Sequence, residues 1–433
     1  MAATRLRGTL DLAADKSIAH RALLFSAMGH GSAEITIRQP GADVLSMAAA
    51  MEKIGAAERL ADRDGALVYR VTGNATTRAA LPGTEEIGLD CGNAGTMMRL
   101  LIGAATTRAA ATTLTGDASL SSRPMERVAT PLRVAGAHVE TSDGHAPVRI
   151  SPTPVLAREH ELPVASAQLV GALTLAALAA SGTTTITSPG PTRDHTERML
   201  AWLGADVSRD GNVTTINGPA LWQNRDIAVP ADPSGAAFWL VAGAVHPDAE
   251  ITMPNVGLNP TRIGVIRVLE RMGAKVEAIS TGVAGPEPAG DLVVHSGARL
   301  NAIHLDGDDV ADVIDELPIL AIAMASAEGT STVRGARELR VKESDRIDLM
   351  AKGLRQLGID VVEHPDGWDI TGRPADPATT SPEPPVIRTE GDHRIAMAFA
   401  VANLAGVGAC TVDDPECAAV SYPAFFEHAE SLT

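Results

Sequence analysis

The sequence has few cysteines and few aromatic residues. Its three cysteines, Cys91, Cys410 and Cys417, form no Cys-x-x-Cys pair and leave an odd thiol. Neither a disulfide framework nor a zinc cluster is therefore indicated, and a reducing cytoplasm is the expected location. Aromatic residues make up 3% of the chain, whereas hydrophobic residues make up 45% and are mostly Ala, Leu, Ile and Val. Such small side chains favour a globular protein in which helices pack closely on sheets.

The sequence is also short of positive charge and of long apolar runs. The formal net charge of −17 argues against binding to nucleic acid or to an anionic membrane, because the mean field repels a polyanion. The N-terminal "MAATRLRGTL" lacks the apolar core of a signal peptide, and apolar runs such as "LPILAIAMA" are too short to span a bilayer. We expect a soluble, cytoplasmic protein, and its 433 residues predict two domains of about 200 residues or three smaller ones.

The sequence does contain an internal repeat. A helix of small residues, a glycine-containing turn and a strand rich in Thr, Ile and Val recur six times, as in "SIAHRALLFSAMGHGSAEITI" and "SGAAFWLVAGAVHPDAEITM". Most copies continue with a second helix that ends in Gly-Ala before another strand, as in "MLAWLGADVS". The glycine suits a left-handed C-cap, and the β-branched residues after it favour a strand. Each unit of roughly 70 to 80 residues is therefore predicted to contain two helices and several strands.

The two ends of the chain predict how the copies divide into domains. The sixth copy stops after "YPAFFEHAESLT" without a closing strand, while the N-terminal "TRLRGTLDL" is a strand without a preceding unit. We infer that these ends complete each other in domain I, which comprises 1–13 and 230–433, and that domain II, 14–229, is inserted. The alternative of a stacked solenoid is disfavoured, because the period is long and each copy opens with different polar residues.

The openings of the first helices predict a binding site for anions. They read "DKSIAHR", "CGNAGTMMR", "ASAQ", "DPSG", "VIDE" and "GDHR". A helix N-terminus carries unpaired N–H groups and partial positive charge, so several such ends around one cleft attract an anion even in an acidic protein. Cations near these ends are Lys16, Arg21, Arg99, Arg123, Arg193, Lys342, Arg346 and Arg394. The expected ligand carries phosphate, carboxylate or both.

Each of these signals also has a purely structural interpretation. Ser17 and Ser166 fit helix N-caps, and Asp315 with Glu316 fits a carboxylate pair stabilised by a helix dipole. The run "KESDR" fits a solvated charged surface. The histidines match no His-Glu-x-x-His pattern, and no P-loop or complete Gly-x-Gly-x-x-Gly occurs, so neither a metal site nor a nucleotide loop is predicted.

Taken together, the motifs resemble those of the 5-enolpyruvylshikimate-3-phosphate synthase family over essentially the full length. The resemblance rests on "DKSIAHRALL", "GNAGTMMRLL", "GDASLSSRPMERV", "VASAQLVGAL", "TRDHTERML", "VIDELPILA", "ELRVKESDRI" and "GDHRIAMAFA", in the family's order. It implies two α/β domains, each of three βαβαββ-type units around a pseudo-threefold axis, with the active site in the interdomain cleft. It also implies transfer of the enolpyruvyl group of phosphoenolpyruvate to the 5-hydroxyl of shikimate 3-phosphate in aromatic amino-acid biosynthesis, without metal or organic cofactor. We expect the protein to be a monomer.

The resemblance assigns two overlapping sets of binding residues. Those implied to hold shikimate 3-phosphate are Lys16, Ser17, Arg21, Ser166, Ala167, Gln168, Arg193, Asp315 and Lys342. Those implied to hold phosphoenolpyruvate are Lys16, Gly95, Arg123, Gln168, Arg346 and Arg394, with Asn93 and Thr96 shaping that pocket. The chemistry needs a base for the hydroxyl proton and an acid for the methylene carbon, and we assign these roles to Asp315 and Glu343, assisted by Lys16.

Three positions bear on how closely the chain follows the family. Val420 stands where many relatives carry a lysine, so one cation near phosphoenolpyruvate is expected to be missing. Leu100 replaces a proline common in the family, as in the sub-branch that includes glyphosate-tolerant members, whereas Gly95 is the residue expected where glyphosate competes with phosphoenolpyruvate. Two alternatives stay open: a UDP-N-acetylglucosamine enolpyruvyl transferase, whose members typically have Lys-Asn where this chain has Lys16-Ser17, and a non-catalytic anion-binding relative, which the missing lysine alone supports.

Overall fold

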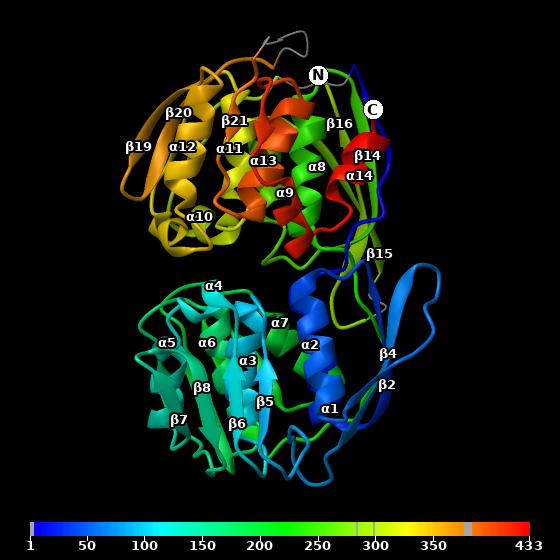
Figure 1. The fold of residues 1–433 in the computed structure, drawn as a ribbon, viewed down its shortest axis with the longest axis vertical. Coiled ribbons are helices and arrows are strands. Elements are labelled where there is room, and N and C mark those ends of the chain that lie inside the picture. The colour runs from blue at the N-terminus through cyan, green and yellow to red at the C-terminus, as the bar shows by residue number, and fades with distance from the viewer. Residues whose placement is uncertain (1–3, 283–284, 298, 376–382) are drawn as a thin grey trace. The chain divides into compact units, whose positions relative to one another are not determined.

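The structure is a computed structural model that describes residues 4–282, 285–297, 299–375 and 383–433 (Figure 1). It divides into two compact units. Unit 1 comprises Met1–Ala13, Pro230–Val283 and Pro288–Thr433, and unit 2 comprises Ala14–Val229 and Ala284–Glu287. The short stretch before Pro288 therefore departs from the predicted assignment of all of 230–433 to domain I. In unit 2 the buried Glu287 forms a hydrogen bond with Nδ1 of His195 at 2.7 Å, which accounts for this grouping.

The described part of unit 2 contains three four-stranded sheets with one strand order. In each sheet a first strand runs parallel to its neighbour, and an antiparallel hairpin follows. Parallel neighbours need a crossover connection, and a helix supplies it. The sheets are β13 (Ile227–Ala228), β2 (His30–Arg38), β4 (Ala66–Asn74) and β3 (Ala57–Arg59); β5 (Ile87–Asp90), β6 (Thr112–Thr115), β8 (His145–Ser151) and β7 (His138–Ser142); and β9 (Glu159–Glu161), β10 (Gly182–Thr187), β12 (Val213–Gly218) and β11 (Val207–Asp210).

Small residues bring the helices of unit 2 close together. An added Cβ at Gly103 would lie 2.1 Å from the carbonyl oxygen of Ala172, so α3 and α6 approach each other more closely there than a side chain allows. Helix α7 is the second helix of its repeat copy, and its C-cap is Gly204. The φ of Gly204 is +100°, so this residue forms the predicted left-handed cap. The helices are α1 (Lys16–Met28), α2 (Ala42–Lys53), α3 (Gly95–Ala105), α4 (Ala118–Ser121), α5 (Glu126–Val134), α6 (Ala167–Ala177) and α7 (His195–Leu203).

Two four-stranded sheets of unit 1 repeat this strand order, and the described residues of the unit also form a two-stranded sheet that has the parallel pair alone. They are β1 (Leu6–Thr9), β14 (Ala249–Gly257), β16 (Ala289–His295) and β15 (Lys275–Gly282); β17 (His304–Leu305), β18 (Gly329–Val333), β20 (Gly367–Gly372) and β19 (Asp360–His364); and β21 (Val386–Ile387) with β22 (Thr411–Val412). With the sheets of unit 2 this makes six copies, so the predicted repeat is confirmed.

The N-terminal strand does not complete the sixth copy, and that part of the prediction is wrong. Strand β1 instead pairs in parallel with β14, where Leu6 lies opposite Ala249, and it leads the fourth copy. The ends of the chain nevertheless meet in unit 1, because the backbone N–H of Arg7 donates to the carbonyl of Leu432 at 3.0 Å. A short strand without hydrophobic alternation carries little information about its partner.

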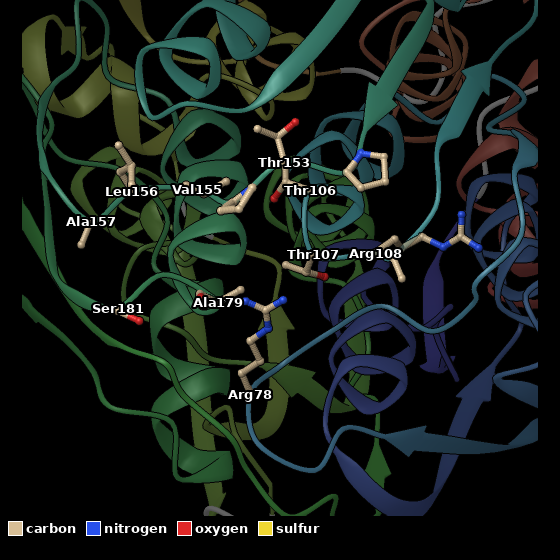
Figure 2. A pocket seen from close by; sticks show the side chains of 13 residues that line it. Arg78, Thr106, Thr107, Arg108, Thr153, Val155, Leu156, Ala157, Ala179 and Ser181 are labelled. Atoms are coloured by element: carbon tan, nitrogen blue, oxygen red, sulfur yellow. Dashed lines mark hydrogen bonds between the residues drawn. The ribbon is translucent and has the colours of Figure 1, made fainter.

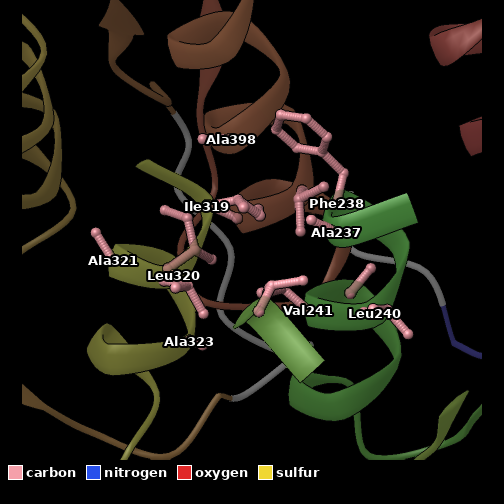
Figure 3. Close-up of a cluster of buried hydrophobic side chains, with 14 of the residues drawn as sticks. Ala237, Phe238, Leu240, Val241, Ile319, Leu320, Ala321, Ala323 and Ala398 are labelled. Atoms are coloured by element: carbon pink, nitrogen blue, oxygen red, sulfur yellow. The ribbon is translucent and has the colours of Figure 1, made fainter. Parts of the chain in front are cut away.

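The core of unit 1 lies between the first helices of its three copies. Figure 3 shows Phe238 and Val241 of α8 facing Ile319 of α11 and Ala398 of α13, and all four are buried. The helices of the unit are α8 (Pro233–Val245), α9 (Gly264–Met272), α10 (Gly307–Val313), α11 (Leu317–Ala325), α12 (Arg346–Gln356), α13 (His393–Leu404) and α14 (Phe425–Ser431), with 3-10 turns η1 (Arg337–Val341) and η2 (Pro415–Val420). No helix in the described ranges of either unit is long and apolar enough to cross a membrane.

Candidate anion-binding active site

In unit 2, helix α1 begins at Lys16. Its N-cap is Asp15, whose carboxylate accepts from the N–H of Ile18 at 3.0 Å. Ser17 therefore lies inside the first turn, and its interpretation as a cap is wrong, because the aspartate before Lys16 already takes that position. Lys16 Nζ lies 2.9 Å from Oδ2 of Asp43 in α2. Asp43 is a residue of the site that the sequence analysis missed.

The same helix presents a buried arginine. Arg21 is 3% exposed, and its Nε donates to Oγ1 of Thr196 at 2.9 Å while its Nη1 donates to the carbonyl of Ser17 at 3.0 Å. Thr196 belongs to the first turn of α7, and Arg193 lies two residues before that helix. The predicted residues of α1 are thereby connected to the start of α7, and Thr196 is a second residue that sequence reasoning missed.

Two guanidinium groups lie beside the start of α3. Gly95 is the first residue of this helix, and an added Cβ there would lie 3.2 Å from Nη1 of Arg123 and 3.4 Å from Nη1 of Arg99. Arg123 is oriented by Asn93, whose Oδ1 accepts from Nη2 at 2.7 Å. The lack of a side chain at Gly95 leaves backbone N–H groups and two cations around one small space, which is the arrangement expected for a bound anion.

The start of α6 joins this cluster through Gln168. Its Oε1 accepts from Nη1 of Arg99 at 2.6 Å, and its Nε2 donates to Oγ1 of Thr96 at 3.0 Å. Ser166 has the predicted N-cap position before Ala167, although its side chain makes no capping hydrogen bond. Hydrogen bonds thus join Thr96 and Arg99 of α3 to Gln168 of α6, and Arg123 with its partner Asn93 lies beside the start of α3.

In unit 1, the sequence "RVKESDR" leads into a buried charge network. Arg346, the first residue of α12, has a side chain that is 1% exposed; its Nε donates to Asp392 Oδ2 at 2.8 Å and its Nη2 to Glu343 Oε2 at 2.6 Å. Although burial by itself lowers the pKa of Arg346, Asp392 and Glu343 together raise it above its ordinary value. The interpretation of this run as a solvated surface is therefore wrong for Arg346.

Asp392 is the residue of unit 1 that the sequence analysis missed. It caps α13 through the N–H of Arg394 at 2.9 Å and also accepts from the hydroxyl of Ser344 at 2.9 Å. Burial alone raises the pKa of Asp392, but the Arg346 guanidinium outweighs it and holds the pKa below its ordinary value. The only sequence signal was its place at a helix start in "GDHR", where an aspartate is usually no more than a cap.

Three predicted cations converge on Asp315, which lies between α10 and α11. Lys342 Nζ is 3.4 Å and Arg346 Nη1 is 3.9 Å from its Oδ1, and Arg394 Nη1 donates to its backbone carbonyl at 2.6 Å. With Glu343 on Arg346, all five residues predicted in this part of the chain come together. The cations lie beside both carboxylates, so Asp315 is placed among groups that can hold an anion, whereas Arg346 opposes Glu343 in the role of an acid.

The position of the expected missing cation is apolar and lies at the end of η2. Val420 is the last residue of this turn and is half-buried. A different cavity, of about 420 Å³, lies in unit 2 between the ends of α3 and α6 and the chain at 152–157 (Figure 2). Thr106, Arg108 and Ala179 line it, so it lies at the opposite ends of these helices from Gly95 and Ala167 and does not contain the predicted anion-binding residues.

The comparisons with known proteins agree on one family. A model of the EPSP synthase family, 3-phosphoshikimate 1-carboxyvinyltransferase, matches residues 1–429. The 3-phosphoshikimate 1-carboxyvinyltransferase of Chloroflexus aurantiacus is 43% identical over 98% of this chain and 96% of its own, and that of Synechococcus sp. (strain WH7803) is 44% identical over 98% and 95%. The structure of an EPSP synthase from Acinetobacter baumannii matches with a TM-score of 0.87 and 39% identity, over 99% and 96% of the two chains. The enolpyruvyl transferase NikO from Streptomyces tendae matches with a TM-score of 0.75 and 20% identity, over 100% and 96%, which shows a common fold alone.

Proposed function

The chain belongs to the EPSP synthase family, and we propose that the residue sets of units 1 and 2 described above bind its two anionic substrates. The reaction is the transfer of the enolpyruvyl group of phosphoenolpyruvate to the 5-hydroxyl of shikimate 3-phosphate, with release of phosphate, in the shikimate pathway of aromatic amino-acid biosynthesis. Both substrates carry phosphate, and phosphoenolpyruvate also carries a carboxylate. The helix starts and arginines of each unit match this chemistry.

The observation that carries the proposal is the convergence of Lys342, Arg346 and Arg394 on Asp315. A carboxylate held among cations stays ionised and can accept a proton, while the same cations can stabilise phosphate as it leaves. A solvated charged surface does not need a fully buried arginine, because its charges are satisfied by water. The cluster therefore supports catalysis more strongly than a purely structural role.

We propose the binding residues that the resemblance to the family implies for each substrate. Shikimate 3-phosphate is held by Lys16, Ser17, Arg21, Ser166, Ala167, Gln168, Arg193, Asp315 and Lys342. Phosphoenolpyruvate is held by Lys16, Gly95, Arg123, Gln168, Arg346 and Arg394, beside Asn93 and Thr96. The prediction that the residues of units 1 and 2 act in one site, which closes on substrate, stays a prediction.

In the proposed reaction, Asp315 takes the proton of the 5-hydroxyl as that oxygen attacks C2 of phosphoenolpyruvate. Glu343 delivers a proton to the methylene carbon, and the product is a tetrahedral adduct that still carries phosphate. Loss of phosphate, with removal of one proton from the new methyl group, restores the enol ether. Glu343 fits the acid role once substrate anions draw Arg346 away from it, since the guanidinium favours its carboxylate form. Lys16 assists at the bridging oxygen of the phosphate.

The test is release of inorganic phosphate by the purified protein when both substrates are present. Asp315→Ala is expected to lower the rate by about 100-fold or more, because general-base catalysis contributes that much. The matched control is Asp312→Ala, which removes an aspartate of α10 that pairs with Arg267 at the surface. Equal phosphate release by the wild type and Asp315→Ala would refute the assignment.

The same assay separates the two alternatives. A UDP-N-acetylglucosamine enolpyruvyl transferase would release phosphate with that sugar nucleotide in place of shikimate 3-phosphate, and a non-catalytic relative would release none with either. We further propose a cytoplasmic monomer that binds neither nucleic acid nor membranes, in keeping with its small anionic substrates. Cell fractionation checks the location and the absence of membrane binding, and sedimentation equilibrium with and without added nucleic acid checks the remaining two points.

A further inference from the structure

Arg394 has a carboxylate neighbour to which no role has been assigned. Its side chain is 14% exposed, and its Nη1 lies 3.6 Å from Oε1 of Glu316, whose side chain is 3% exposed. Glu316 is the N-cap residue of α11 but makes no capping hydrogen bond with its side chain. A carboxylate removed from water in this way needs partners, and Arg394 is one of them.

Glu316 is anchored from its other side by a buried chain of contacts. The hydroxyl of Ser234 in α8 donates to Glu316 Oε1, and Nη2 of Arg262 donates to Ser234 Oγ and to Asp232 Oδ1, each at 2.9 Å. Ser234 is 7% exposed and Arg262 is 4% exposed. The carboxylate of Glu316 therefore has a fixed position, and it connects the substrate-facing Arg394 to the start of α8.

The repeat gives an independent reason to regard Arg262 as part of this arrangement. "PTRDHTERMLAWLGA" in unit 2 and "PTRIGVIRVLERMGA" in unit 1 place Arg193 and Arg262 at the same position, and each segment reaches its C-capping glycine after the same number of residues. Arg193 is proposed to bind shikimate 3-phosphate. Its counterpart Arg262 is instead buried against Asp232 and Ser234. One arginine of the repeat thus supports the site from within the unit.

The charges around Arg394 explain why it needs such support. Arg394 shares Asp315 with Lys342 and Arg346, and these like charges repel one another. The carboxylate of Glu316 offsets part of this repulsion and keeps one edge of the guanidinium turned into the unit. The remaining donors can then face an anion in a fixed orientation, which matters because small displacements of a binding group cost large factors in rate.

We propose that Glu316 is a positioning residue for Arg394 and that Ser234 and Arg262 hold it in place for this role. The inference rests on the proposed function only in that Arg394 binds phosphoenolpyruvate. Glu316 itself acts through the guanidinium and is not assigned a contact with substrate.

The test is steady-state kinetics of Glu316→Gln, which keeps the acceptor for Ser234 but removes the charge beside Arg394. We expect the KM for phosphoenolpyruvate to rise about 10- to 100-fold, while the KM for shikimate 3-phosphate stays within about twofold. A purely structural role would raise both constants or lower kcat alone, and that result would overturn the proposal. The matched control is Glu328→Gln, which removes an exposed charge just beyond the other end of α11 and should change neither constant.

A double-mutant cycle separates this inference from the proposed function. In an Arg394→Ala background, Glu316→Gln should have no further effect on the KM for phosphoenolpyruvate, because its only route is the missing guanidinium. The same fold-change in both backgrounds would refute the positioning role. If Arg394→Ala alone leaves that KM unchanged, the proposed role of Arg394 fails instead. Should Glu316→Gln not fold, Ser234→Ala removes the anchoring hydroxyl and should give a smaller change of the same kind.

Discussion

His20 predicts how the stability of this protein depends on pH. The residue follows Lys16 by one helical turn, is fully buried, and neither ring nitrogen has a hydrogen-bond partner among the described residues. Burial is the main cause that lowers its pKa to about 3; Lys16 and Arg21 lower it further, and Asp43 opposes them. His20 is therefore neutral in the folded protein at physiological pH, and it adds no charge to those of Lys16, Arg21 and Asp43 around it.

The magnitude follows from the difference between the folded and unfolded states. An unfolded histidine binds a proton below about pH 6.5, whereas folded His20 does so only near pH 3. Between these values the unfolded state holds the extra proton, so the free energy of unfolding falls by about 1.4 kcal/mol for each pH unit on acidification. From pH 8 to pH 5, His20 should therefore cost about 2 kcal/mol of stability.

The perturbation that isolates this effect is His20→Leu, which removes the titrating ring at similar volume. Urea unfolding of both proteins is measured at pH 8 and pH 5, and the difference between the wild type and the variant is compared at the two pH values. We expect the variant to gain about 2 kcal/mol relative to the wild type on acidification. A difference that does not change with pH would show that His20 titrates in the folded protein as it does in the unfolded chain, and would refute the reasoning.

Three further predictions concern the anion-binding residues. Glyphosate should inhibit competitively with phosphoenolpyruvate, and inhibition that is independent of phosphoenolpyruvate concentration would contradict this prediction. Gly95→Ala should raise the inhibition constant of glyphosate, because the new methyl group would lie 3.2 Å from Arg123 Nη1. Lys342→Ala should lower kcat/KM by about 100-fold or more. Arg340→Ala loses contacts to Asp345, to Glu363 and to the carbonyl of Pro365 but to no proposed substrate-binding residue, and it should leave kcat/KM nearly unchanged. Equal small effects of the two substitutions would restore the solvated-surface interpretation. Asp392→Asn should lower the free energy of unfolding by about 3 to 5 kcal/mol at pH 7. Urea unfolding should show that this loss shrinks as the pH falls below about 4, because a carboxylate whose pKa is lowered by folding contributes stability that acid removes. A loss of stability that is independent of pH would contradict the prediction.

The repeat was predictable because its signal is local. A helix of small residues, a glycine and a run of β-branched residues occur together in each copy, so periodicity and turn chemistry point to the same structure. The partner of β1 was not predictable, since four residues without a clear alternation fit more than one sheet edge. The strand with which β1 pairs, β14, lies more than two hundred residues away in the sequence, and the pairing is determined by the tertiary structure.

The residues of the candidate site also include some that were predictable from the sequence and some that were not. The helix starts and their cations were predictable from residue types and from the motifs they form. The fully buried Arg346 was not, because a charged run normally indicates solvent, and its partner Asp392 lies 46 positions along the chain. Ser17 was misassigned as a cap because Asp15, two residues earlier, competes for the same N–H groups with a stronger acceptor.

The parallel pairing of β13 with β2 has a consequence for how the protein is made. The first copy of unit 2 obtains one of its strands from Ile227–Ala228, so all strands of the three sheets of this unit have been synthesised once the ribosome has passed that point. Strand β1 leaves the ribosome first, yet it waits roughly 12 to 50 s for its partner Ala249–Thr252 at ordinary rates of synthesis. The segment that begins the chain is therefore among the later ones to fold, and the inserted unit should be the earlier one to resist protease on stalled nascent chains.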